Sequence, residues 1–324
     1  LNELKEKYAD PRRSKIRPDI GEIEIEDLID EEDVLITLTR QGYIKRLPAD
    51  TYKVQNRGGR GVIGLTTKED DFVEDLFITS THDTILFFTN QGRVYSKKAY
   101  EIQEGKRQAK GQAIINILQL EKGEKVQAVF PIKTDDPNVK LEELDVVFVT
   151  KNGLIKKITA DNFSNIRSSG IRAITLVEDD ELIGAKYTGK DSQVMLVTEQ
   201  GQSIMFPLDD LRPLGRTARG VKGITLNKGD HVVSVNLVED NKYLLIVSEL
   251  GYGKKTLMTN YKSQSRGGKG VRTYKITKKT GQVVSAHVVN MDDETMLVSA
   301  KGDVIRLAVR DISTQGRATQ GVKL

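Results

Sequence analysis

The sequence contains neither cysteine nor tryptophan, and only 6% of its 324 residues are aromatic. Without cysteine the chain can form no disulfide and no cysteine zinc site, which fits a reducing compartment, so we expect a cytoplasmic protein. No apolar run approaches the ~18 residues of a membrane span, so we expect no transmembrane helix. Residues 1–5 lack the apolar core of a signal peptide, and the absence of an initial Met suggests a piece of a longer protein.

Patterns for catalysis and metal binding are also missing. His82, His231 and His287 fall in different parts of the chain, and there is no P-loop and no G-x-S-x-G motif. Residues 59–64 match G-x-G-x-x-G, but a strand pattern follows them where a dinucleotide site requires a helix. The sequence therefore predicts no catalytic residue, no cofactor site and no metal site in this chain.

What the sequence does contain is a repeat of about 50 residues, present six times. Each copy has an apolar run, a turn with glycine and a second apolar run with basic residues, and the copies start near residues 33, 83, 144, 193, 243 and 294. The turn glycines are Gly42, Gly92, Gly153, Gly201, Gly251 and Gly302. About 19 residues after each of them comes a second glycine: Gly61, Gly111, Gly170, Gly220, Gly270 and Gly321.

This repeat predicts an all-β fold. The two runs around the turn glycine indicate a β-hairpin, and two further short strands follow, such as residues 221–225 and 232–238 in the fourth copy. Four strands per repeat are typical of a propeller blade, so we expect residues 21–324 to form one six-bladed, propeller-like disc.

The sixth repeat lacks a fourth strand. Residues 21–29 alternate polar and apolar side chains, and we expect them to supply this strand and close the ring, which would remove an exposed sheet edge. Alternatively, the natural chain continues beyond Leu324 and the disc is open. Residues 1–20 lie outside the repeat, with helical spacing of Leu1, Leu4 and Tyr8 up to Pro11, and we expect the tail of a preceding domain followed by a linker.

Positive charge is concentrated at one position of the repeat. The loops between the second and third expected strands are residues 55–61, 104–111, 166–172, 215–222, 264–272 and 315–323. They hold 15 Lys or Arg residues and one acid, a charge of +14 in a chain whose net charge is +4, so the remainder carries about −10. Around a ring such loops form a positive belt, which suits a long polyanion such as duplex DNA with one charge per ~1.7 Å of axis. Contacts from Lys and Arg to phosphates read no base sequence.

A second basic series follows the hairpin glycines and includes Lys45–Arg46, Lys156–Lys157 and Lys254–Lys255. Side chains alternate along a strand, so only one member of each pair needs to face outward. From the loops and this series we predict DNA contacts by the following residues: Lys45, Arg46, Lys106, Arg107, Lys110, Lys156, Arg167, Arg172, Arg216, Arg219, Lys222, Arg266, Lys269, Arg272 and Arg317.

Residues 55–61, Gln-Asn-Arg-Gly-Gly-Arg-Gly, resemble the gyrase A box, Gln-Arg-Arg-Gly-Gly-(Arg/Lys)-Gly, of the C-terminal domain of the A subunit of bacterial DNA gyrase. Asn56 replaces an Arg of the motif, whereas the other six residues match: Gln55, Arg57, Gly58, Gly59, Arg60 and Gly61. The resemblance covers residues 21–324, and residues 4–14 are similar to the end of the preceding breakage–reunion domain. Residues 264–270 form a second, box-like copy.

The resemblance implies a β-pinwheel, in which neighbouring blades exchange strands and DNA bends around the rim. It implies that residues 55–61 bind DNA and latch the wrapped segment with positive handedness, which supports negative supercoiling by the whole enzyme. The DNA-cleaving tyrosine, ATP and Mg²⁺ would belong to other domains or subunits. The implied partners are duplex DNA and, within an A2B2 enzyme, the B subunit together with the rest of the A subunit. The isolated domain is expected to be monomeric.

Two other functions remain open from the sequence. One is the equivalent domain of the topoisomerase IV A subunit, which binds DNA for decatenation or relaxation. The other is a protein-interaction propeller that presents its basic belt to acidic partners. Six complete hairpin repeats and the box in the first repeat favour gyrase.

Overall fold

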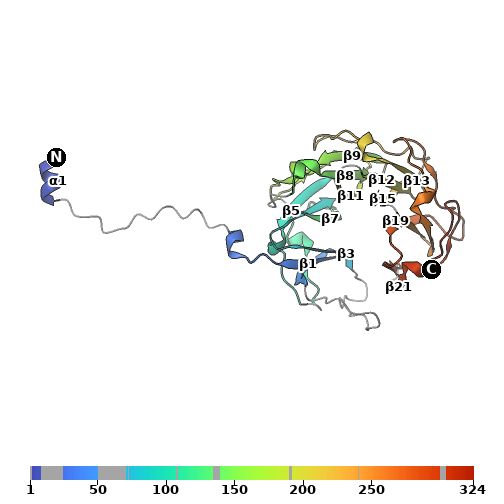
Figure 1. The fold of residues 1–324 in the computed structure, drawn as a ribbon, viewed down its shortest axis with the longest axis horizontal. Coiled ribbons are helices and arrows are strands. Elements are labelled where there is room, and N and C mark those ends of the chain that lie inside the picture. The colour runs from blue at the N-terminus through green and yellow to red at the C-terminus, as the bar shows by residue number, and fades with distance from the viewer. Residues whose placement is uncertain are drawn as a thin grey trace.

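The fold is a ring of antiparallel β-sheets around a central opening, which the chain follows from β1 to β21 (Figure 1). The computed structural model describes residues 2–8, 25–49, 71, 73–106, 109–133, 139–189, 192–239, 241–299 and 304–324. The helix expected near the N-terminus is α1 (Asn2–Tyr8), and all of its residues are exposed. Among all the described residues, no helix has the length and apolar character needed to cross a membrane.

Five blades each contain four strands. We name the strands from the centre of the ring outward. Blade one is β3 (Val73–Ser80), β1 (Asp33–Thr39), β2 (Tyr43–Pro48) and β6 (Gln112–Ala113); blade two is β7 (Val126–Ile132), β4 (Thr84–Thr89), β5 (Arg93–Lys98) and β10 (Ile171–Arg172); blade three is β11 (Leu182–Thr188), β8 (Asp145–Thr150), β9 (Leu154–Thr159) and β14 (Val221–Lys222); blade four is β15 (Val232–Val238), β12 (Gln193–Thr198), β13 (Gln202–Pro207) and β18 (Val271–Arg272); blade five is β19 (Val283–Val289), β16 (Tyr243–Ser248), β17 (Tyr252–Leu257) and β22 (Val322–Lys323).

The outermost strand of every four-stranded blade comes from the next repeat along the chain. For example, β14 follows the basic loop of repeat four, yet it pairs with β9 of blade three through Val221 opposite Ile155 and Lys222 opposite Leu154. The same exchange joins β6, β10, β18 and β22 to the blades before them. The exchange implied by the family resemblance is therefore confirmed, and each exchanged strand is only two residues long.

The described hairpin turns are fixed by the residue types around their glycines. In blade four, Gly201 has φ +79°, a conformation that L side chains rarely adopt. The Gln202 amide donates to Oγ1 of Thr198 at 3.1 Å, and the Gln200 amide donates to a carboxylate oxygen of Asp230 at 2.9 Å. These contacts satisfy turn amides that the strand ladder leaves unpaired.

The cores lie between neighbouring blades. The side chains of β4 alternate, so Ile85 and Phe87 join the core shared with blade one, whereas Leu86 and Phe88 join the core shared with blade three. Two further clusters lie between blades three and four and between blades four and five. A strand buried on both faces explains the continuous apolar runs in the sequence.

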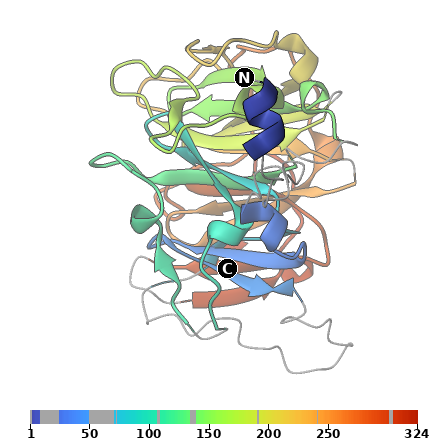
Figure 2. The ribbon, with the colours of Figure 1, turned by 90° about the vertical axis from the view of Figure 1, so that its left-hand side faces the viewer.

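The expectation that residues 21–29 close the ring as a strand is wrong for its described part. Ile25–Leu28 form a 3-10 helix, η1, which lies beside the 3-10 helix η3 (Ala99–Glu101) in Figure 2. Polar contacts to blade two hold this segment: the Lys98 ammonium lies 2.8 Å from the Glu26 carboxylate, and Nε2 of His82 lies 2.9 Å from the Ile29 carbonyl oxygen. Leu28, one of the apolar residues of this segment, is 76% exposed.

The sixth blade is only partly represented among the described residues. There it consists of the hairpin β20 (Glu294–Val298) and β21 (Val304–Ala308), with no further paired strand. The predicted count of six blades is thus matched by five complete blades and one hairpin.

Phe88 provides a test of the core between blades. Its ring centroid lies 5.1 Å from that of Phe130, 5.2 Å from that of Phe148 and 5.7 Å from that of Phe163. We expect Phe88→Ala to lower the free energy of unfolding by about 3–5 kcal/mol, because it removes a large buried side chain and leaves a cavity. The control Ile115→Ala, at a side chain that is 66% exposed, should change it by less than about 0.5 kcal/mol. Urea denaturation measures both, and equal effects would contradict this assignment of the core.

Candidate nucleic-acid interface

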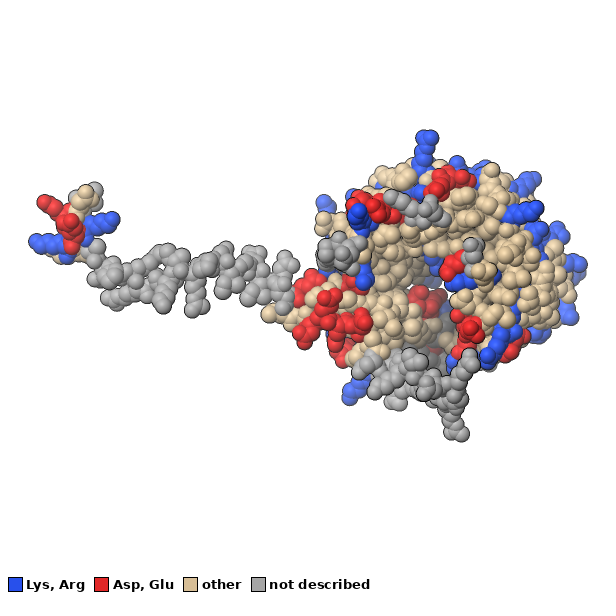
Figure 3. Space-filling view, viewed as in Figure 1, with Lys and Arg blue, Asp and Glu red and all other residues tan. Residues whose placement is uncertain are grey.

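The basic loops lie on the rim of the ring because each one leads into an exchanged outer strand. In Figure 3, Lys and Arg side chains follow the outer edge of the disc along the top and right of the view. Most of the predicted loop residues are exposed: Lys106, Arg167, Arg172, Arg216, Arg219, Lys222, Arg266, Lys269 and Arg272. Lys110 and Arg317 are half-buried. Arg107 and the whole box, residues 55–61, lie outside the described residues.

A glycine fixes the end of each described loop against the blade that receives its strand. Gly111, Gly220, Gly270 and Gly321 all have positive φ, and a Cβ at any of them would lie 2.2–2.7 Å from a backbone carbonyl oxygen of the preceding blade. At Gly170 a Cβ would instead lie 2.6 Å from the ring of Tyr95. The second glycine series of the sequence therefore marks close backbone approach at the exchange point.

Along the rim, the segments that directly follow the loops of repeats three, four and five are hydrogen-bonded to the next loop. Oγ1 of Thr175 donates to the Thr217 carbonyl and Oγ1 of Thr225 donates to the Gly267 carbonyl, both at 2.7 Å. The Lys275 amide donates to the Thr319 carbonyl at 3.0 Å. The loops of repeats three to six therefore form one connected chain of contacts.

Arginines of adjacent loops come together around a shallow hollow. It has a volume of about 640 Å³, and its charged lining residues are Arg167, Arg172 and Arg216, from repeats three and four. Guanidinium groups bind phosphate oxygens in a bidentate manner, so this part of the rim suits a phosphodiester backbone.

Two predicted DNA contacts must be corrected. Lys45 is 1% exposed, and its Nζ donates to the carbonyls of Lys106 at 3.1 Å and Ala109 at 2.8 Å. Lys156 is 0% exposed, and its Nζ donates to the carbonyls of Ala173 and Arg216, both at 2.6 Å. Strand alternation turns both side chains under the basic loop of the next repeat, so they hold the loop and cannot reach DNA.

Arg46, the neighbour of Lys45, has a different environment. Its side chain is 16% exposed, and one guanidinium nitrogen lies 3.7 Å from a carboxylate oxygen of Glu104. An arginine paired with the one acid of the basic loops has less charge available for phosphate than the exposed loop arginines.

The box-like copy at residues 264–270 shows how such a motif is arranged. Gly267 and Gly270 have φ of +81° and +69°, while Gly268 has room for a side chain. A guanidinium nitrogen of Arg266 donates to the Lys222 carbonyl at 3.0 Å, and Lys269 is exposed. The glycines thus shape the turn, and the basic residues attach it to the adjacent loop or point outward.

Two further residues hold the loops from below, and neither was predicted to contact a loop. A guanidinium nitrogen of Arg93 donates to the Ser169 carbonyl at 2.5 Å, and Nζ of Lys254 donates to the carbonyls of Gly316 and Arg317 at 2.5 Å. For Lys254 a usable signal existed, because the third residue after the hairpin glycine is a lysine in three repeats: Lys45, Lys156 and Lys254. Arg93 directly follows its glycine and lies outside this signal.

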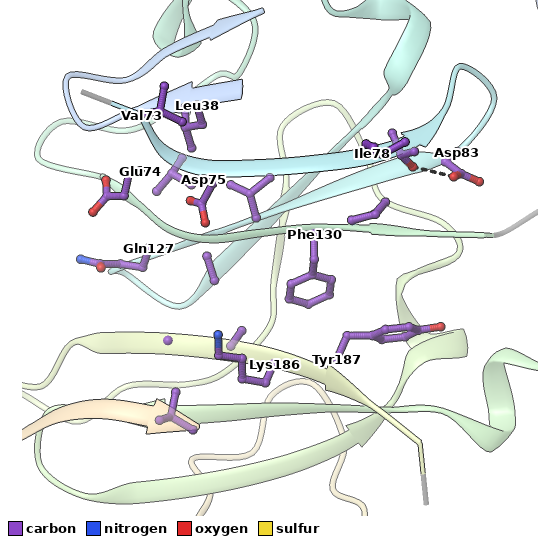
Figure 4. Close-up of a pocket in the computed structure, with 18 of the residues that line it drawn as sticks. Leu38, Val73, Glu74, Asp75, Ile78, Asp83, Gln127, Phe130, Lys186 and Tyr187 are labelled. Atoms are coloured by element: carbon purple, nitrogen blue, oxygen red, sulfur yellow. Dashed lines mark hydrogen bonds between the residues drawn. The ribbon is translucent and has the colours of Figure 1, made fainter. Parts of the chain in front are cut away.

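The centre of the ring carries the opposite charge. A cavity of about 1200 Å³ is lined by the inner strands, and its charged residues are Glu31, Asp33, Glu74, Asp75, Asp83, Lys133 and Lys186, with His287 also present. In Figure 4, Asp75 extends from β3 into this space, opposite Lys186. Burial raises the pKa of Asp75 to about 6, and the Glu74 charge adds to the shift. Acids also surround the opening in Figure 3, so a polyanion is repelled from the centre and attracted to the rim.

No metal centre is evident in the described part of the chain. No group of three or more His, Asp or Glu side chains there is arranged to hold an ion.

A ring of four-stranded sheets that exchange their outer strands, with a basic rim and an acidic centre, defines a propeller-type domain whose rim suits a polyanion. The family model described as "DNA gyrase C-terminal domain, beta-propeller" matches residues 33–80, 83–133, 144–188, 192–239, 242–290 and 293–324. The chain belongs to this family.

Relatives agree with this assignment. The chain is 56% identical over 324 residues to the DNA gyrase A subunit of Clostridium acetobutylicum, a match that covers 100% of this chain and 38% of that protein. It is 45% identical over 327 residues to the DNA gyrase A subunit of Staphylococcus aureus, covering 100% of this chain and 36% of that protein. The chain thus spans less than two fifths of the length of these relatives.

Two solved structures are similar to the whole ring. A DNA gyrase A C-terminal domain has 31% sequence identity and a TM-score of 0.70, with 90% of this chain and 95% of that chain covered. The C-terminal domain of a DNA topoisomerase IV has 26% identity and a TM-score of 0.78, with 91% and 90% covered.

The glycine at the exchange point offers a direct test of the rim. We expect Gly270→Ala to lower the free energy of unfolding by about 1–3 kcal/mol, because its Cβ would lie 2.2 Å from the Ser203 carbonyl oxygen at a φ of +69°. The matched control is Gly316→Ala, where no atom lies within 4 Å of the added Cβ. Chemical denaturation of both variants is the measurement. If Gly270→Ala is as stable as the control, the close approach at the exchange point is wrong.

Proposed function

We propose that this domain binds duplex DNA around its rim without sequence preference, and that it bends the DNA and wraps it with one handedness. The observation that carries the proposal is the ring of exposed basic loops at the exchange points, against an acidic centre. Phosphate contacts from Lys and Arg are independent of base sequence, which fits a domain that has to engage any DNA segment.

The number of loops matters because DNA must bend in order to wrap, and bending costs free energy. Bending 20–30 base pairs by 40–90° costs on the order of 1–6 kcal/mol, and a path around much of a disc costs a multiple of that. One loop of two or three basic residues cannot offset this cost. Loops in series, hydrogen-bonded to one another, present a continuous and preorganised track that can.

Within a whole enzyme, the wrapped segment would be presented for strand passage, so that DNA gyrase introduces negative supercoils with the energy of ATP. The partners proposed for the chain are the gyrase B subunit with the remainder of the gyrase A subunit in an A2B2 assembly. Cleavage chemistry, ATP and Mg²⁺ are assigned to those parts, and this domain is assigned a cytoplasmic, DNA-binding role as a monomeric unit. The family membership and the match of the full chain to gyrase A subunits support this proposal.

The second candidate is the corresponding domain of topoisomerase IV, which is favoured by the TM-score of 0.78 to such a domain. Sequence favours gyrase, because identity reaches 56% with a gyrase A subunit, compared with 26% with that topoisomerase IV domain. Residues 55–61 keep the Gly-Gly core of the gyrase A box in the first repeat.

The length dependence of DNA affinity tests wrapping. We expect affinity to rise steeply with duplex length from about 15 base pairs until several blades are engaged, well below the ~150 base pairs of the persistence length. With six to ten phosphate contacts, affinity should fall about 10³–10⁵-fold between 50 and 200 mM salt. Fluorescence anisotropy with a duplex series measures both. A flat profile from the shortest duplex onward would contradict wrapping and favour a small acidic ligand.

The box in the first repeat is proposed as the latch that sets the handedness of the wrap. The double variant Arg57→Ala/Arg60→Ala should abolish the change in linking number of relaxed circles while it weakens DNA binding by less than about tenfold, because the other basic loops remain. The matched control is Arg266→Ala/Lys269→Ala in the box-like copy, which should keep the linking-number change. Equal loss of binding and of handedness in the box variant would rule out a latch role.

A further inference from the structure

We propose that the buried lysines Lys45, Lys156 and Lys254 are positioning residues that hold the basic loop of the next repeat in its DNA-binding arrangement. The inference deepens the proposed function and depends on it. All three lysines occupy the third position after a hairpin glycine, in blades one, three and five. None of them is more than 1% exposed, so they act on DNA only through the loops that cover them.

The contacts join each ammonium group to the backbone of the loop. Lys156 donates to the carbonyl of Arg216, and Lys254 donates to the carbonyls of Gly316 and Arg317. Lys45 donates to the carbonyls of Lys106 and Ala109 across a loop that belongs to repeat two. In each case at least one carbonyl belongs to a basic loop residue, so the buried lysine fixes the backbone from which a rim side chain extends.

The sites are built to hold a charged donor. Nζ of Lys156 lies 5.9 Å from the ring centroid of Phe148, and Nζ of Lys254 lies 5.8 Å from that of Tyr274, within the range of cation–π attraction. Hydrogen bonds from a charged donor are about twice as strong as neutral ones. An ammonium group therefore gives the loop carbonyls charge-assisted hydrogen bonds that an apolar side chain cannot make.

The positive charges of the loop arginines also act on Lys156 and Lys254 beneath them. Burial lowers the pKa of Lys156 and of Lys254 to about 8, and the charges of Arg216 and Arg317 contribute to the shift. A phosphate on either arginine would offset this repulsion, so DNA binding should favour the protonated lysine. Binding is then accompanied by proton uptake near and above pH 8.

Two other blades show that the fold does not require the lysine. In blade two the position is Tyr95, which packs under Gly170, and Arg93 donates to the Ser169 carbonyl in its place. In blade four it is Ile204, and the next loop is held by the bond from the Gln264 amide to the Met205 carbonyl and by Arg266. Isoleucine is thus a substitute that this chain already tolerates at the same position.

A double-mutant cycle with the 324-residue chain tests the proposal. We expect Lys254→Ile to weaken binding of a long duplex by about tenfold, or roughly 1.4 kcal/mol. In the Arg317→Ala background, the same substitution should cost less than about twofold, because the side chain that it positions is gone. The control Lys278→Ile removes one exposed positive charge outside the basic loops and should keep its effect in both backgrounds.

The outcomes separate this proposal from the proposed function. Failure of the unaltered chain to bind duplex DNA would overturn the proposed function itself. If it binds but Lys254→Ile has no effect, or costs the same in both backgrounds, the positioning role is wrong. If Lys254→Ile loses the far-UV spectrum of the unaltered chain, the same cycle is run with Lys156→Ile and Arg216→Ala, for which the same results apply.

The pH dependence of DNA affinity is a readout that a purely structural role would not change. In the unaltered chain, affinity should fall as pH rises from 7 to about 9.5, through the pKa of about 8 at which Lys156 and Lys254 lose their protons. In Lys156→Ile/Lys254→Ile this fall should be at least halved, because the two titrating groups are absent. Identical pH profiles for the two proteins would overturn the proposal.

Discussion

The pairing of a two-residue strand with the edge of the preceding blade is the interaction on which the rest of the structure depends. It joins consecutive repeats by backbone hydrogen bonds, covers the outer edge of each complete blade and brings the preceding loop to the rim. The pairing requires close approach, which explains why a glycine with positive φ directly precedes each exchanged strand. Because the described loops of repeats three to six then contact one another, the same pairing places their exposed basic side chains on the rim.

Charge is separated by the same geometry. A residue that repeats in the loops is placed on the rim, while the inner strands contribute acids such as Glu74 and Asp75 to the centre. The weak net charge of +4 therefore hides two regions of opposite sign. Three buried lysines beneath the loops also matter, although the surface charge does not reveal them. They are Lys45, Lys156 and Lys254, and each donates hydrogen bonds to carbonyls of the loop above it.

The sequence predicts the local units of this fold well and their connections poorly. Turn glycines such as Gly201, with an apolar run on each side, identify the hairpins, because both signals are local. The strand Val221–Lys222 could pair within its own blade or with the preceding blade, and the local sequence pattern would be the same in both cases. Only the family resemblance therefore indicated the exchange. For the site, composition located the loops, but the direction of Lys156 depends on strand parity and on what covers the strand. The alternation in residues 21–29 was misleading because the contacts of Glu26 and Ile29 with blade two, remote in sequence, decide the position of that segment.

The central claim is that the rim wraps DNA with one handedness, and the linking number of closed circles tests it most directly. Relaxed circular DNA is incubated with the 324-residue chain, relaxed again by a nicking–closing enzyme and freed of protein. Wrapping with positive handedness predicts topoisomers with raised linking number, in proportion to the amount of protein bound. An unchanged topoisomer distribution under conditions where the chain is fully bound to the DNA would contradict the account.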